Sequence, residues 1–508
     1  MISKVISAGL FGIDAFLVDV EVDIAQGLAH WTTVGLPESS VKESRDRIIA
    51  AIKNSGYQFE RKRITINLAP ADIKKEGTAF DLPMAIGLLA SSNLIKGHAF
   101  SEDLLVGELS LKGEVKPIAG ALQIALLAKE KKLKRIILPF ENITEALVVK
   151  EIEVCGVKTL SEVVQHYTGE KTLEVCRPET LLKKPMPQEY FDFSDIKGQL
   201  QSRRAIEVAA AGGHNLLMIG PPGSGKTMLS QRLPGILPNM SFEEALETTR
   251  IYSAVGLLKK DTSLMSARPF RSPHHTISSA GLAGGGSHPR PGEVSLAHNG
   301  VLFLDELPEF QKNVLEILRQ PLESGNVSIS RAAASMTFPA RFMLVASMNP
   351  CRCGHRGSLK QECVCSESAV RLYRHRLSGP LLDRIDIQLE VPPVSYGELS
   401  SLQEGEKSQI IRQRVLKTRE IQKTRFQGTS IRCNAQMTSR FLRKYCVLGD
   451  RESQLLEKAV EKLNLSARAY DRILRVSRTI ADMENSDAIK TSHLSEAIHY
   501  RSLDRNAF

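Results

Sequence analysis

The sequence predicts an α/β domain with a parallel sheet in the middle of the chain, an α+β domain before it and a helical domain after it. An apolar run of strand length, Leu216–Ile219, leads directly into the glycine-rich turn GPPGSGKT. A second apolar run ends in the acidic pair of VLFLDE at 301–306, which is typical of a buried parallel strand. After residue 394, apolar residues recur with helical spacing, whereas short strands and helices alternate before residue 170.

The turn at 220–227 has the pattern of a phosphate-binding loop. Its glycines let successive backbone N–H groups turn inward, and a helix that begins near Lys226 adds the positive end of its dipole. We predict that Lys226 holds the β and γ phosphates of ATP and that Thr227 binds Mg²⁺. A glycine-rich turn that binds no ligand is the alternative. The predicted cradle consists of Gly220, Pro221, Pro222, Gly223, Ser224, Gly225, Lys226 and Thr227.

Polar side chains end two further predicted strands. Asp305 and Glu306 follow the apolar residues of VLFLDE, and ligands of open α/β sheets bind at the carboxyl ends of the strands. We predict Asp305 as an Mg²⁺ ligand and Glu306 as the group that polarises the attacking water. A pair that only caps the strand is the alternative. The strand FMLVASMN at 342–349 ends in Asn349, whose amide is suited to orienting the water or the γ-phosphate.

The charge of the chain is concentrated near its C-terminus. The formal net charge is +10, and residues 401–508 hold 21 lysines and arginines against 13 aspartates and glutamates. Such an excess favours a polyanionic partner whose phosphates are neutralised by these residues. A solvated helical surface without a ligand is the alternative.

The sequence predicts a cytoplasmic protein with no membrane partner. Asp14 and Asp19 interrupt the N-terminal apolar residues before a signal peptide or anchor could form. No apolar run reaches the length of a membrane span. Eight cysteines in 508 residues, beside an ATP site, favour a reducing compartment rather than a disulfide framework.

Composition divides the chain into four segments. Residues 171–190, KTLEVCRPETLLKKPMPQEY, contain three prolines and mixed charges and are typical of a linker. We therefore expect one domain at 1–170, a nucleotide-binding core with a Cys-rich insertion at 191–393, and a basic helical lid at 394–508.

The first segment resembles the proteolytic domain of Lon proteases, a fold shared with domain 2 of ribosomal protein S5. The likeness lies in the loop and helix that follow Glu76-Gly77 and in the hairpin GELSLKGEVKPIAG. The Lon family uses a Ser-Lys dyad. The corresponding positions here are Ala79 and Leu122, which can neither attack a carbonyl nor accept a proton. The resemblance thus implies the scaffold without the protease.

The remaining segments resemble the AAA+ ATPases, because GPPGSGKT, VLFLDE, ASMNP and a helical lid follow one another in order. More narrowly, the chain resembles the magnesium-chelatase-like group known as YifB or ComM. The narrow match rests on FRSPHHTISSAGLAGGG at 270–286, NPCRCG at 349–354, RLSGPLLDRIDI at 376–387 and LSARAYDRILRVSRTIADM at 465–483. This resemblance implies a homo-oligomeric ring, a hexamer, with each ATP between neighbouring subunits.

A ring of this kind needs a cation that one subunit supplies to its neighbour's γ-phosphate. Arg384, in LLDRIDI, matches the position of the arginine finger, and Arg468, in LSAR, matches the lid arginine that senses nucleotide. Arg472 is the alternative to Arg468. The alternatives to Arg384 are Arg371, Arg374 and Arg376.

Two segments are candidates for substrate contact in the pore of such a ring. Residues 325–347 read as a β-hairpin with Arg331 beside its tip, and Arg331 is the predicted DNA contact. Residues 281–286, after His274-His275, form a glycine-rich loop. A purely structural turn is the alternative for each.

Four cysteines lie close together in CRCGHRGSLKQECVC. Cys351, Cys353, Cys363 and Cys365 could close a tetrahedral zinc site, although the two C-x-C pairs depart from the usual C-x₂-C spacing. Reduced free thiols are the alternative. Cys155, Cys176, Cys433 and Cys446 are scattered, and His274 and His275 have no spacing that indicates metal ligands.

Two functions remain open at this point. The resemblance implies an ATP-driven branch-migration helicase or translocase that acts on branched or single-stranded DNA in homologous recombination during natural transformation. The alternative is a chelatase-type ATPase that remodels a protein partner. The residues at Ala79 and Leu122 argue against an ATP-dependent protease.

Overall fold

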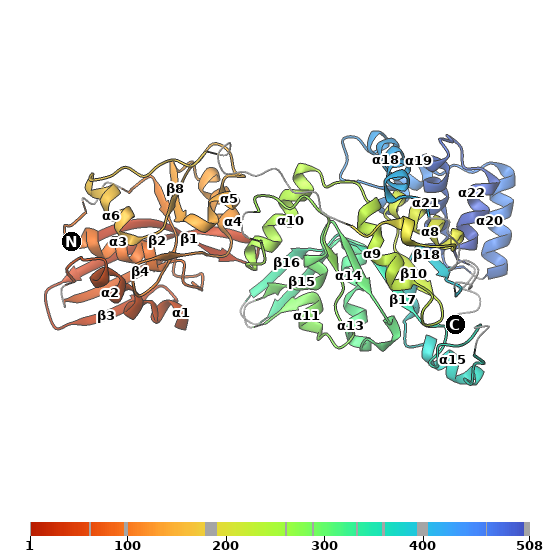
Figure 1. The fold of residues 1–508 in the computed structure, drawn as a ribbon, viewed down its shortest axis with the longest axis horizontal. Coiled ribbons are helices and arrows are strands. Elements are labelled where there is room, and N and C mark those ends of the chain that lie inside the picture. The colour runs from red at the N-terminus through yellow and green to blue at the C-terminus, as the bar shows by residue number, and fades with distance from the viewer. Residues whose placement is uncertain are drawn as a thin grey trace. The chain divides into compact units, whose positions relative to one another are not determined.

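A computed structural model describes residues 2–59, 62–95, 100–177, 190–259, 262–286, 289–331, 334–357, 361–393, 405–463 and 465–501. The chain forms two compact units (Figure 1). Unit 1 comprises residues 1–186 and 242–266, and unit 2 comprises residues 187–241 and 267–508. The four predicted boundaries remain predictions.

Unit 1 is built on a seven-stranded sheet of order β3-β4-β2-β1-β5-β8-β9. Strands β1, β2 and β4 pair antiparallel, whereas the β3–β4 pair and the β1-β5-β8-β9 run are parallel. The strands of unit 1 are β1 (Ile2–Phe11), β2 (Asp14–Ala25), β3 (His30–Val34), β4 (Arg63–Ala69), β5 (Asp103–Leu105), β8 (Arg135–Pro139) and β9 (Glu153–Val157), with a separate hairpin of β6 (Glu108–Leu109) and β7 (Val115–Lys116).

Helix α3 supplies much of the core of unit 1, because all of its residues are buried. Two helices of unit 1, α1 and α2, meet at Glu43. The helices of unit 1 are α1 (Ser39–Lys42), α2 (Ser44–Asn54), α3 (Asp81–Ser91), α4 (Ala121–Glu130), η1 (Phe140–Asn142), α5 (Ile143–Ala146), α6 (Leu160–Thr168) and α10 (Phe242–Ala254).

Helix α10 belongs to unit 1 although its sequence follows the phosphate-loop helix. Ser253 donates hydrogen bonds to Gln123 Oε1, at 2.7 Å, and to Glu145 Oε1, and all three residues are buried. The carbonyl of Ser253 also accepts from Gly120 N at 3.0 Å. These polar contacts join α10 to the start of α4 and to α5.

Unit 2 contains a five-stranded sheet of order β11-β14-β17-β10-β18, in which every pair is parallel. The strands β10, β14 and β17 are entirely buried, as expected for a sheet covered on both faces. The strands are β10 (Leu216–Ile219), β11 (Phe270–Arg271), β14 (Val301–Leu304), β17 (Met343–Met348) and β18 (Ile387–Glu390), with two hairpins, β12 (Gly284–Gly285) with β13 (Arg290–Pro291) and β15 (Asn326–Arg331) with β16 (Ala334–Pro339).

The C-terminal helices gather beside this sheet (Figure 1). The helical spacing that the sequence shows after residue 394 is confirmed by α18, α19, α20, α21 and α22. None of the described helices is long and apolar enough to cross a membrane. The helices of unit 2 are η2 (Phe193–Asp195), α8 (Leu200–Gly212), α9 (Lys226–Ile236), α11 (Ser279–Ala283), α12 (Glu293–Leu296), η3 (Leu307–Glu309), α13 (Lys312–Ile317), α14 (Arg319–Ser324), α15 (Glu367–Arg374), α16 (Gly379–Leu382), α18 (Ser408–Arg425), η4 (Asn434–Gln436), α19 (Ser439–Tyr445), α20 (Asp450–Leu463), α21 (Ala467–Met483) and α22 (Thr491–His499).

Candidate nucleotide-binding site

The glycine-rich turn connects β10 to α9, as the sequence predicted. Gly223 and Gly225 adopt left-handed conformations with φ of 74° and 84°, which L residues with a side chain rarely adopt. At Gly220 a Cβ atom would lie 2.3 Å from the carbonyl oxygen of Val391. The turn therefore needs glycine at these positions for its backbone path.

Lys226 begins α9, and its ammonium points back into the turn. Its Nζ donates to the carbonyl oxygens of Gly220, at 2.7 Å, and of Pro221, at 3.0 Å, and lies 3.5 Å from Asn349 Oδ1. Burial lowers the pKa of this ammonium, while the carboxylates of Asp305 and Glu306 act in the opposite direction. The lysine thus lies between the phosphate loop and the carboxyl ends of β14 and β17.

Asp305 contacts hydroxyl groups from two neighbouring elements. Its Oδ2 accepts a hydrogen bond of 2.9 Å from Thr227 Oγ1, and its Oδ1 accepts from Ser347 Oγ. Ser347 lies in the predicted strand at 342–349 but was not singled out, because nothing in its sequence context marks it. A carboxylate beside a threonine hydroxyl at the start of a helix is a donor set that fits Mg²⁺ bound to phosphates.

Glu306 follows Asp305 in a left-handed conformation with φ of 53°. Its side chain is 54% exposed, and its Oε2 lies 3.5 Å from Nδ1 of His275. No local pattern connects these two residues, since they are 31 positions apart in the sequence. The structure brings them together because β11, which ends just before the histidines, pairs with β14.

Arg384 is buried rather than exposed. The residue is 5% exposed, and its guanidinium donates to Glu323 and, at 2.7 Å, to the carbonyl of Pro380. Among its alternatives, Arg376 has a side chain that is 53% exposed and paired with Glu309 at 3.0 Å. Arg371 is exposed, and Arg374 is partly buried and donates to the carbonyl of Pro350 at 3.4 Å.

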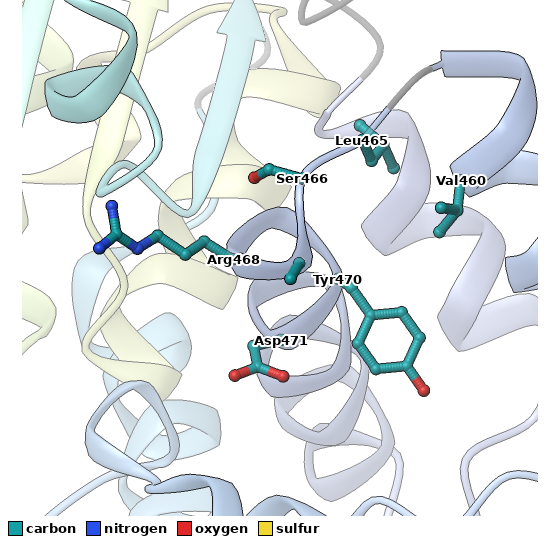
Figure 2. Close-up of a pocket in the computed structure, with 7 residues that line it drawn as sticks. Val460, Leu465, Ser466, Arg468, Tyr470 and Asp471 are labelled. Atoms are coloured by element: carbon teal, nitrogen blue, oxygen red, sulfur yellow. The ribbon is translucent and has the colours of Figure 1, made fainter.

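Arg468 lies at the start of α21, where Ser466 caps the helix by accepting from Ala469 N at 3.2 Å. Figure 2 shows Arg468 and Tyr470 extending in opposite directions from this turn, which lines a pocket. Arg468 is exposed. The hydrogen bond from Arg384 is the main cause of the lowered pKa of the Glu323 carboxyl, and the charge of Arg468 acts in the same direction. Its alternative, Arg472, instead pairs with the buried Asp386.

The four predicted cysteine ligands converge. Their sulfur atoms all lie within 4.8 Å of one another, and among the described residues they are the cluster that could hold a metal ion. Cys351 Sγ lies 3.4 Å from Cys353 Sγ and 3.6 Å from Cys363 Sγ. The other four cysteines are also free thiols and stand apart from the cluster.

A hairpin is confirmed within the predicted range 325–347: β15 and β16 pair from Asn326↔Pro339 to Arg331↔Ala334. Residues 343–347 belong instead to β17 of the parallel sheet. The side chain of Arg331 and the tip at 332–333 lie outside the described residues.

In unit 1, Leu122 is fully buried in the first turn of α4, and Ala79 is partly buried with its carbonyl accepting from Gly107 N at 2.9 Å. Both positions that the sequence comparison assigns to the Lon dyad carry aliphatic side chains, and the assignment itself stays a prediction.

Family models of magnesium chelatase match most of the chain. The model described as magnesium chelatase, subunit ChlI, matches residues 192–399, and those described as subunit ChlI of Mg-chelatase and as the ChlI C-terminal part match 20–142 and 405–501. With the parallel sheet and phosphate loop, these matches define a magnesium-chelatase-like AAA+ ATPase with a helical C-terminal region.

Full-length relatives narrow the class further. Competence protein ComM of Haemophilus influenzae is 45% identical over 99% of this chain and 97% of its own length. The uncharacterized protein YifB of Escherichia coli is 45% identical over 99% and 98%. The chain therefore belongs to the YifB/ComM family. Lon protease 2 of Bacillus subtilis is 28% identical over 29% of this chain and 29% of its own, which agrees with the predicted Lon-like domain.

Proposed function

We propose that the protein is an ATP-hydrolysing ring motor that acts on DNA, as a branch-migration helicase or translocase in homologous recombination during natural transformation. The observation that carries the ATPase part is the contact of Thr227 with Asp305 at the carboxyl edge of the sheet, next to Glu306. The DNA part is supported by the basic C-terminal segment and by the printed name of the Haemophilus influenzae relative.

In this proposal each residue of the sheet edge has one task. The backbone of 220–225 and the ammonium of Lys226 bind the triphosphate, and Thr227 and Asp305 hold Mg²⁺. The ion, when bound, offsets negative charge on the phosphate oxygens. Glu306 accepts the proton of the attacking water, and Asn349 orients that water or the γ-phosphate.

In the proposed ring, two arginines have roles at the interface between neighbouring subunits. Arg384 supplies the cation to the neighbour's nucleotide, and Arg468 senses nucleotide from the lid. Because Arg384 is paired with Glu323, this role requires the ion pair to open when the subunits assemble. Glu323 is 63% exposed, so its carboxylate can turn to solvent.

A polyanion threaded through the ring would meet the hairpin of β15 and β16 and the glycine-rich residues 281–286. Arg331 is the proposed phosphate contact on the hairpin. The net charge of +8 over residues 401–508 adds a sequence-independent attraction.

Four thiolates at Cys351, Cys353, Cys363 and Cys365 are proposed to hold a structural zinc ion, which suits the reducing cytoplasm.

The second candidate is a chelatase-type ATPase that remodels a protein partner. The 38 kDa magnesium-chelatase subunit of Cereibacter sphaeroides favours it, being 27% identical over 33% of this chain and 54% of its own length. The ATP site of such a remodelling ATPase would have the same geometry as the ATP site of a DNA motor.

DNA binding across a salt series separates the two candidates. A translocase is expected to bind branched or single-stranded DNA with an affinity that falls steeply from low to physiological salt, by about 10³-fold or more if it neutralises six or more phosphates. Fluorescence anisotropy with a labelled four-way junction measures this fall. Lack of measurable binding at low salt would favour the protein-remodelling candidate.

A further inference from the structure

The cysteine cluster lies within a few residues of the nucleotide site. Strand β17 ends at Met348, Asn349 follows, and the first ligand, Cys351, comes two positions later. Cys351 is fully buried, while the other three cysteines are partly exposed. The cluster is therefore anchored at the edge of the sheet on which the proposed catalytic groups stand.

The sulfur geometry fits a tetrahedral metal ion. Zinc–thiolate bonds of about 2.3 Å place the sulfur atoms about 3.8 Å apart, since a tetrahedron's edge is about 1.6 times its centre-to-corner distance. The observed Sγ separations of 3.4, 3.6 and 3.6 Å among Cys351, Cys353 and Cys363 are close to that value. They are also far beyond the bonded distance of a disulfide, about 2.0 Å.

The turn held by the cluster touches the phosphate loop. Gly354 has φ of 83°, and its N donates to the carbonyl of Cys351 at 3.0 Å. A Cβ atom at Gly354 would lie 2.8 Å from Cδ of Pro222 and 4.0 Å from Cγ of Asn349. The backbone of this turn therefore packs closely on one residue of the cradle and approaches the amide that contacts Lys226.

We propose that a zinc ion bound by the four thiolates fixes this turn as a support for Pro222 and Asn349, so that nucleotide affinity depends on the metal. The inference rests on the zinc binding proposed above and adds a role to it. Without the ion the loop has few apolar residues to hold it, and the cradle loses a rigid neighbour. The cysteines are thus positioning residues for the nucleotide site.

A pair of glycine substitutions tests the support without touching a ligand. Gly354 and Gly357 both have positive φ, 83° and 76°, but a Cβ at Gly357 would meet no described atom within 4 Å. Gly354→Ala is expected to weaken binding of a non-hydrolysable ATP analogue by about tenfold, through overpacking against Pro222, and to keep its zinc. Gly357→Ala carries the same backbone strain and is expected to bind within about twofold of wild type.

Metal content is measured on the same full-length proteins by elemental analysis. Wild type is expected to carry about one zinc per chain, and Cys363→Ser to lose both zinc and nucleotide affinity, while Cys176→Ser, outside the cluster, keeps both. If Cys363→Ser does not fold, wild type treated with a chelator and a reversible thiol reagent replaces it.

Two results would overturn the proposal: zinc-free wild type, or Gly354→Ala and zinc-depleted protein that bind the analogue as wild type does. Because these measurements need neither hydrolysis nor DNA, they stand apart from the test of the motor function. A protein that binds zinc and analogue as expected but ignores DNA would contradict only that function.

Discussion

Unit 2 keeps its candidate catalytic carboxylates at the accessible edge of a parallel sheet, whereas two carboxylates of unit 1, Asp81 and Glu145, are enclosed. Glu306 has a side chain that is 54% exposed, but Asp81 is 1% and Glu145 6% exposed. Burial raises the pKa of both enclosed carboxyls, to about 6 for Asp81. Burial and hydrogen bonds within the fold give these two carboxyls of unit 1 structural roles, while the candidate catalytic carboxylate Glu306 at the sheet edge of unit 2 stays accessible.

The largest expected effect concerns Glu306. Glu306→Gln removes the proton acceptor but keeps the size and polarity of the side chain, so turnover is expected to fall by about 10³-fold with nucleotide affinity unchanged. Glu145→Gln in unit 1 is the matched control and should keep both the turnover and the nucleotide affinity of wild type. Steady-state ATPase rates and analogue binding measure both effects, and near-normal hydrolysis by Glu306→Gln would remove that residue from its role.

The next largest effect concerns the arginine that one subunit supplies to the nucleotide of its neighbour. Arg384→Ala is expected to lower turnover by about 10³-fold, since a finger arginine stabilises charge that develops on the γ-phosphate. Arg376→Ala, at an exposed alternative position, is the control. If only the Arg376 variant loses turnover, the finger assignment moves to that residue.

Mixed rings show whether Arg384 acts on its neighbour. Subunits with Arg384→Ala keep an intact phosphate loop, and subunits with Lys226→Ala keep Arg384. Mixing the two inactive variants should restore part of the activity only if the arginine acts in trans. A purely structural role within one subunit would leave the mixture inactive.

The enclosed carboxyl of Asp81 should make unit 1 sensitive to pH. Its folded pKa of about 6 exceeds the unfolded value of about 3.9, so the folded state binds more protons between these pH values. Stability is therefore expected to fall by about 3 kcal/mol as pH rises from about 4 to about 6. The pKa of about 6 already includes the opposing effect of Arg47, whose Nε donates to Asp81 at 2.8 Å.

Denaturation followed by tryptophan fluorescence measures this change, because the single tryptophan, Trp31, lies in β3 of unit 1. Asp81→Asn should flatten the pH dependence, and Asp46→Asn, on the exposed face of α2, should not. Equal curves for wild type and Asp81→Asn would show that the enclosed carboxyl does not titrate in this range.

The smallest expected effect concerns His275, which contacts Glu306. Asn places a donor near the position of Nδ1, whereas Leu offers none, so His275→Asn should retain turnover and His275→Leu should lower it by about tenfold with an unchanged KM. Steady-state ATPase rates over a range of ATP concentrations separate kcat from KM. Equal turnover of the two variants would make the 3.5 Å contact irrelevant to catalysis.

The local sequence predicted those structural features whose residues are continuous along the chain. The strand, turn and helix at 216–236, the acidic end of β14 and the hairpin within 325–347 follow from apolar runs and glycine positions. The four cysteines were also found from their short spacing. Each of these confirmed features depends on residues that lie close to one another in the sequence.

Contacts between distant segments could not be predicted in this way. The local sequence does not indicate that His275 contacts Glu306 or that Ser253 contacts Glu145. Each contact depends on which strands or helices become neighbours in the fold. The burial of Arg384 was missed for the same reason, since Glu323 comes from a separate helix.

The ATPase rate of the wild-type protein, measured with and without a branched DNA junction at low salt, tests the central claim most directly. Coupling of hydrolysis at the edge of unit 2 to work on DNA predicts a rate that the junction raises several-fold, and that added salt returns to the basal level. A basal rate that no concentration of junction changes would contradict the account.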